Sequence, residues 1–103
     1  MDKIGVILVN YKDYAKRFLS ECRDSLREQS LPKEQFAVYI VDNASTEETQ
    51  KYLAENYPEA IVLPRADGNY SAANNAGIAR AWADGCDFFV VANMDTKFDR
   101  DWL

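Results

Sequence analysis

The sequence predicts a three-layer α/β/α fold, in which a mostly parallel sheet of about four strands lies between helices. Two observations lead to this prediction. Four short apolar runs alternate with three segments whose apolar residues recur at helical spacing. The connections are short, which is typical of parallel strands joined through helices that cover both faces of one sheet. At 103 residues the chain is expected to form one domain or part of one.

The first half of the chain supplies two strands and one helix. Residues 4–9 form a continuous aliphatic run that stops at polar Asn10, as expected of a strand buried on both faces. Residues 13–29 carry an apolar stripe at helical spacing and charged residues on the opposite side. Residues 36–42 form a second apolar run that stops at Asp42.

A second helix and a third strand follow. Ser45 with Glu48 three residues later matches a capping box, which predicts the start of a helix that continues to about residue 56. Pro58 ends this helix, and the short run at residues 60–64 is the third strand.

The last helix and strand are predicted from small residues and from a second long apolar run. Residues 71–84 are rich in alanine, so this helix can lie close to the sheet, and Gly85 is placed to cap its C-terminus. Residues 88–92 form the fourth strand, which leads directly into Asn93 and Asp95.

Composition excludes several classes of function. The net charge of −5 argues against binding to a nucleic-acid backbone. The chain has no histidine, and Cys22 and Cys86 have no metal-ligand spacing, so we expect two reduced, structural thiols and no zinc site. No apolar run approaches the roughly 20 residues of a membrane helix, and the N-terminus does not resemble an export signal. A cytoplasmic location is therefore expected.

Polar residues follow every predicted strand, where open parallel sheets bind their ligands. No glycine-rich phosphate loop follows the first strand, which excludes the common dinucleotide and P-loop motifs. The first strand also lacks the terminal acid that a phosphohydrolase or receiver domain would use. For Asp42 and Asn43, a turn or capping role and a ligand-binding role both remain open.

Four motifs, "VILVNYKD", "YIVDNAST", "NYSAANNAGIARA" and "VVANMDT", resemble family 2 glycosyltransferases, which have the A-type, Rossmann-like fold. The motifs occur in the family's order and span nearly all of residues 1–103, so the resemblance implies the nucleotide-binding half of such an enzyme. It also implies site roles: Asn10 and Tyr11 on the nucleoside, Asp42 on a pyrimidine N–H, Asn93 on the ribose, and Asp95 holding Mg²⁺ or Mn²⁺ at the diphosphate. Asn74 and Asn75 are poor helix formers, so one of them, Asn74 in preference, is expected to face the site; two exposed amides on the helix surface are the alternative.

The implied activity is metal-dependent transfer of a sugar from a UDP- or dTDP-sugar to an acceptor hydroxyl. Asn93 replaces the first acid of the family's D-x-D motif and Asn69 replaces a glycine, for which a left-handed backbone is expected. The acceptor half and the catalytic base are expected beyond residue 103, so no catalytic residue is assigned. The alternative is a non-catalytic binding or association module, and a face left bare by truncation is expected to self-associate.

Overall fold

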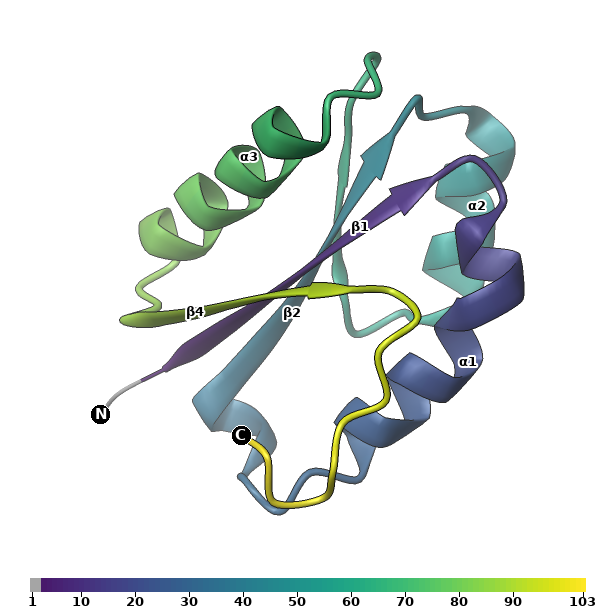
Figure 1. Ribbon diagram of the computed structural model, residues 1–103. Coiled ribbons are helices and arrows are strands. Elements are labelled where there is room, and N and C mark those ends of the chain that lie inside the picture. The colour runs from purple at the N-terminus through teal and green to yellow at the C-terminus, as the bar shows by residue number, and fades with distance from the viewer. Residues whose placement is uncertain (1–2) are drawn as a thin grey trace.

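The computed structural model describes residues 3–103 and contains one four-stranded, entirely parallel sheet in the order β3-β2-β1-β4. Helices lie on both sides of this sheet (Figure 1), which confirms the predicted α/β architecture. The elements are β1 (Ile4–Tyr11), α1 (Tyr14–Arg27), a 3-10 turn (Lys33–Gln35), β2 (Phe36–Asn43), α2 (Glu47–Asn56), β3 (Ile61–Pro64), α3 (Tyr70–Ala83) and β4 (Phe88–Asn93).

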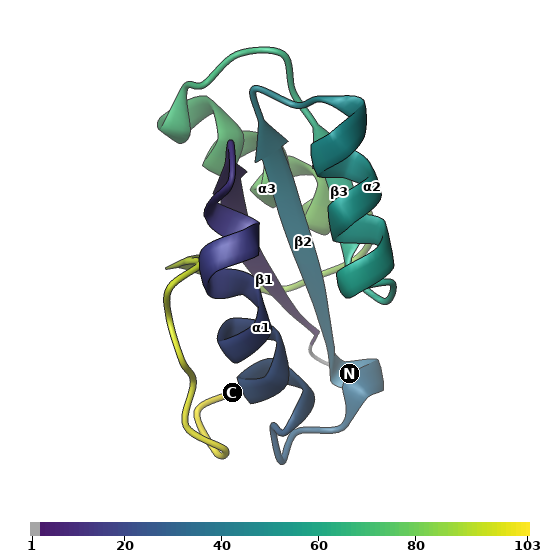
Figure 2. The same cartoon turned by 90° about the vertical axis from the view of Figure 1, so that its right-hand side faces the viewer.

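The two faces of the sheet have separate apolar cores. Val6 and Leu8 of β1 pack with α1 and α2, whereas Ile7 and Val9 belong to the core beneath α3. Figure 2 shows α1 and α2 together on the near side, with α3 behind the sheet. Because side chains alternate along a strand, every residue of central β1 from Gly5 to Asn10 is buried against one layer or the other.

Close packing of α3 confirms the prediction made from its small residues. A Cβ added at Gly77 would lie 2.5 Å from Cγ2 of Ile7, so only glycine allows this approach. At its end, Gly85 has a φ of +92°, and the Cys86 N–H donates to the Ala81 carbonyl at 2.9 Å. This is a Schellman cap, as the position of Gly85 predicted.

The N-terminus of α2 differs from the prediction. Its capping box is formed by Thr46 and Thr49, not by Ser45 and Glu48. The Ser45 hydroxyl instead donates to Asp42, and Glu48 is free to form an ion pair with a lysine of α1. All five residues from 45 to 49 are polar, and the strand-to-helix geometry decides which of them caps the helix.

The expectation of a left-handed backbone at Asn69 was wrong. Its φ is −74°, and its side-chain oxygen accepts the Ala72 N–H at 2.9 Å, so Asn69 is the N-cap of α3. Asparagine is among the strongest N-cap residues, and this role needs an extended backbone.

After β4 the chain turns and runs along α1 (Figure 1). The Phe98 N–H donates to the buried Ser25 hydroxyl at 3.0 Å, and the Gln29 side chain donates to the Asp99 carbonyl at 2.6 Å. These bonds attach the segment that follows Asp95 to a rigid helix.

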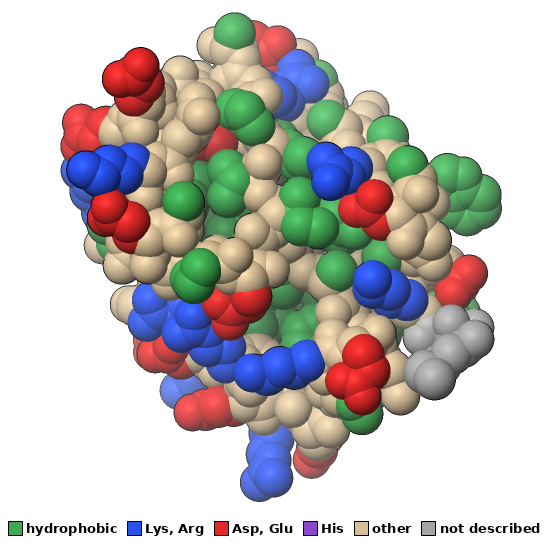
Figure 3. Space-filling view, turned by 180° about the vertical axis from the view of Figure 1, so that it is seen from behind, with side chains coloured by type: hydrophobic (Ala, Val, Ile, Leu, Met, Phe, Trp, Pro, Cys, Tyr) green, Lys and Arg blue, Asp and Glu red, His purple; other side chains and the backbone are tan. Residues whose placement is uncertain are grey.

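The surface and the thiols agree with the composition. On the face seen in Figure 3, several basic side chains adjoin one another across the lower part of the view, and acidic side chains lie beside them. Cys22 and Cys86 are both buried and free, as expected. No helix within residues 3–103 combines the length and the apolarity required to cross a bilayer.

Candidate functional site

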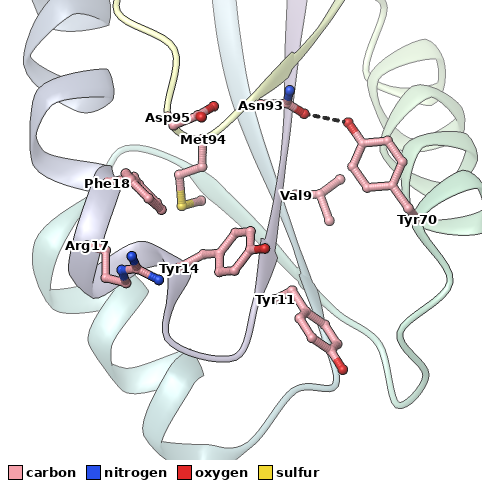
Figure 4. Close-up of a pocket in the computed structure, with 9 residues that line it drawn as sticks. All are labelled: Val9, Tyr11, Tyr14, Arg17, Phe18, Tyr70, Asn93, Met94 and Asp95. Carbon is pink, nitrogen blue, oxygen red and sulfur yellow. Dashed lines mark hydrogen bonds between the residues drawn. The ribbon is translucent and has the colours of Figure 1, made fainter.

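A cavity of about 460 Å³ opens at the carboxyl ends of β1 and β4. The chain passes from β1 to β2 through α1 on one face and from β3 to β4 through α3 on the other, so the strand order reverses between β1 and β4. Crevices at such switch points are where open α/β sheets bind ligands. The lining residues, drawn in Figure 4, are Val9, Tyr11, Tyr14, Arg17, Phe18, Tyr70, Asn93, Met94 and Asp95.

One wall of this cavity is aromatic. Tyr11, at the end of β1, meets Tyr14 edge-to-face with ring centroids 6.4 Å apart, and Tyr14 meets Phe18 in the same manner at 6.0 Å. Tyr11 and Tyr14 are 37% and 46% exposed, so their rings are open to a ligand. Such a wall can accept a planar base or the apolar face of a sugar.

The other wall carries the polar groups that follow β4. The Tyr70 hydroxyl, from the first turn of α3, donates to Oδ1 of Asn93 at 2.9 Å (Figure 4). Asp95 is exposed and has no hydrogen bond or ion pair with any residue that the structure describes. Asn93 and Asp95 thus line the same cavity, directly at and after the end of β4.

The carboxylate of Asp95 could bind a cation whose other ligands come from a bound phosphate and from water. Within residues 3–103, no three side chains of the His, Cys, Asp or Glu type come together as a metal cluster. One free carboxylate is nevertheless enough for Mg²⁺ or Mn²⁺ when a phosphate and water supply the remaining oxygens. The residues present thus fit a metal held jointly by protein and ligand.

Asn10 and Asp42 do not line the cavity; their side chains lie on the side of the sheet that α1 and α2 cover. Asp42 is completely buried and accepts hydrogen bonds from Asn10 Nδ2 at 2.8 Å, Ser45 Oγ at 2.8 Å and Thr49 Oγ1 at 2.6 Å. The side-chain oxygen of Asn10 accepts the Ala15 N–H at 2.9 Å. The two residues join β1 and β2 to the starts of both helices, and neither lines the cavity.

Asn43 is a polar residue whose role the sequence left open. It pairs with Tyr11 in the β1–β2 register, so both side chains lie on the α3 side of the sheet. Asn43 is only 1% exposed, its Nδ2 donates to the Asn69 carbonyl at 3.2 Å, and its buried Oδ1 has no partner among the described residues. The alternation of side chains along β1 and β2 is the sequence signal that could have identified Asn43 as a neighbour of Tyr11, because paired residues of adjacent strands point to the same face.

Asn74 lies in α3, partly buried, and it does not line the cavity. Its side-chain oxygen is also buried without a partner in the part of the chain that the structure describes. A partnerless buried oxygen is uncommon in folded proteins, where such groups bond to protein or to ordered water.

The sequence model of one protein family, described as "Glycosyl transferase family 2", matches residues 5–103, which is nearly the whole chain. The chain belongs to glycosyl transferase family 2. No curated protein gives a significant match to it.

Several solved structures share the fold. TarS of S. aureus superposes with a TM-score of 0.79 at 22% identity, covering 96% of this chain and 18% of that one. TarS 1–349 in complex with UDP gives 0.80 at 21% identity, covering 96% and 29%. The mannosyltransferase PcManGT of Pyrobaculum calidifontis, in complex with GDP-Man and Mn²⁺, gives 0.75 at 24% identity, covering 93% and 28%. The chain therefore spans only 18–29% of the length of these chains.

Proposed function

We propose that this chain binds a UDP- or dTDP-sugar together with a divalent metal. It would act as the donor-binding part of a family 2 glycosyltransferase, which transfers the sugar to an acceptor hydroxyl. The observation that carries the proposal is the cavity at the switch point between β1 and β4, which joins an aromatic wall to Asn93 and Asp95. Family membership, and the UDP, GDP-Man and Mn²⁺ named for the solved relatives, support a nucleotide ligand and a divalent metal.

Within this cavity Tyr11 would lie against the base and Asn93 would contact the ribose. Asn93 keeps its Nδ2 for the ligand, because Tyr70 occupies its Oδ1. Asp95 would hold Mg²⁺ or Mn²⁺, and a bound ion supplies neutralisation of the charge that develops on the departing diphosphate. No residue of this chain is assigned as the base that deprotonates the acceptor.

Base recognition is better supported at Asn43 than at Asp42. The free Oδ1 of Asn43 can accept a pyrimidine N–H beside Tyr11, whereas both oxygens of Asp42 are already engaged. Because Asn43 is covered, this contact requires the exposed loop at residues 66–69 to shift when the base binds. Asn10 and Asp42 would then support the site from behind. A place for Asn74 beside the nucleotide stays a prediction.

Isothermal titration of the 103-residue chain with UDP and with uridine, in Mn²⁺ and in EDTA, tests the proposal. We expect UDP to bind more tightly in Mn²⁺, and we expect Asp95→Ala to remove this gain while uridine binding is unchanged. Asp101→Ala, which removes an exposed charge outside the cavity, is the matched control. Absence of UDP binding by folded protein in Mn²⁺ would contradict the proposed function.

A second candidate function, a non-catalytic association module, is favoured by the single carboxylate at the metal position and by the open edge of β4. This edge pairs with nothing on its outer side among the described residues, and Phe88, Val91 and Trp82 near it are 55%, 45% and 69% exposed. Self-association through this edge predicts dimers in sedimentation equilibrium, and a monomer at high concentration would count against it. The cytoplasmic location also stays a prediction.

A further inference from the structure

Arg17 is a cation in the cavity to which no role has been assigned. It lies in the first turns of α1, its side chain lines the cavity, and its guanidinium lies 5.1 Å from the centre of the Phe18 ring (Figure 4). The aromatic contact steadies the side chain without consuming its hydrogen-bond donors. The guanidinium is therefore presented to whatever occupies the cavity.

Most of the other arginines are paired, and among the described residues Arg100 alone shares with Arg17 the lack of an ion pair. Four of the six form ion pairs: Arg23 with Asp24 at 3.0 Å, Arg27 with Glu59 at 2.6 Å, Arg65 with Asp67 at 2.7 Å, and Arg80 with Asp84 at 3.1 Å. Arg17 has no ion pair or hydrogen bond with any of residues 3–103, in a chain with 17 acidic and 12 basic residues. An excess of acids makes a free arginine inside a cavity a candidate for binding an anion.

The charged residues that line the cavity indicate that the anion is the diphosphate of the nucleotide. Without Arg17, Asp95 would be the one charged side chain among the lining residues, and it would repel a diphosphate. Asn93 stands at the position of the second metal-binding acid, and its Oδ1 is already bonded to Tyr70. A guanidinium can offset this repulsion, because its planar donors match two phosphate oxygens at once.

We infer that Arg17 binds the diphosphate of the nucleotide directly, as a second cationic contact beside the metal. This inference rests on the proposed function, since it concerns the same ligand. Its consequence is that the chain keeps measurable affinity for a nucleoside diphosphate when metal is removed.

The test is titration of UDP and of uridine into the wild-type chain, Arg17→Gln, Arg17→Lys and Arg100→Gln, each in Mn²⁺ and in EDTA. Arg100 is exposed and outside the cavity, so its variant has the same loss of charge without the contact. In EDTA we expect Arg17→Gln to weaken UDP binding about 10-fold or more. Arg17→Lys should recover part of the loss, uridine binding should not change, and Arg100→Gln should match wild type.

The outcomes separate the two proposals. If wild type binds UDP in Mn²⁺ but loses all binding in EDTA, or if Arg17→Gln equals Arg100→Gln, the role of Arg17 is overturned and the proposed function stands. If folded wild type binds neither UDP nor uridine under any condition, the proposed function fails, and the inference fails with it. Circular dichroism of each variant confirms that only folded protein is compared.

Discussion

Replacing Asp42 by alanine should destabilise the fold rather than alter a ligand contact. The carboxylate is fully buried and holds three donors that come from β1, from the β2–α2 connection and from α2. Truncation removes all three bonds at once and leaves a small polar cavity. Among the lost partners, the Asn10 amide matters most, because its remaining acceptor, the Lys12 carbonyl, is 3.4 Å away.

The magnitude follows from these partners. A buried amide left without a good acceptor costs about 1–3 kcal/mol, and hydrogen bonds to a carboxylate contribute about 1.5–3 kcal/mol each. The hydroxyls of Ser45 and Thr49 can find replacements, since Thr49 also bonds to the Thr46 carbonyl at 3.0 Å. We therefore expect Asp42→Ala to lower the free energy of unfolding by about 3–5 kcal/mol. Thr49→Val removes the bond to Asp42 and also the Thr49 side of the capping box, so it should cost about 2–3 kcal/mol.

Urea denaturation followed by circular dichroism measures both losses. With the slope of about 1–3 kcal/mol per molar typical of small domains, Asp42→Ala should lower the midpoint by more than about 1 M. A loss below about 1 kcal/mol, together with weaker uridine binding, would refute the structural role and restore Asp42 as a direct nucleoside contact.

Two further predictions concern the packing on each face of the sheet. Gly77→Ala places a methyl group 2.5 Å from Ile7 and 3.2 Å from Val41, so thermal unfolding should show a loss of about 1–3 kcal/mol, whereas Ala79→Ser on the exposed side of α3 should change stability little. Burial, with a smaller contribution from the charge of Asp95, raises the pKa of the Cys22 thiol to about 12. A raised folded-state pKa means that the contribution of Cys22 to stability is complete below pH 9 and is lost as the pH rises towards 12, and Cys22→Ala should flatten this part of the stability curve. Titration of the native chain with a thiol reagent at pH 8 should find Cys22 unreactive until urea is added, and rapid labelling without urea would contradict the burial.

Much of the fold could be predicted from local patterns. Each apolar run forms one strand of the sheet. Gly85 ends α3 because few other residues accept a φ of +92°. The capping of α2 and α3 was less predictable. Ser45 and Thr46 are both good caps in isolation, and Thr46 caps α2 while the Ser45 hydroxyl donates to buried Asp42.

The sequence by itself determined the layered α/β fold, the family and the end of the sheet where polar groups gather, because apolar runs must be buried and parallel strands end together. Only the tertiary structure decided which polar groups face the cavity. A step of one residue along a strand turns a side chain to the opposite face, and this step separates buried Asp42 from Asn43. Arg17 became part of the site only because α1 packs beside the end of β4, a contact between segments far apart in the chain.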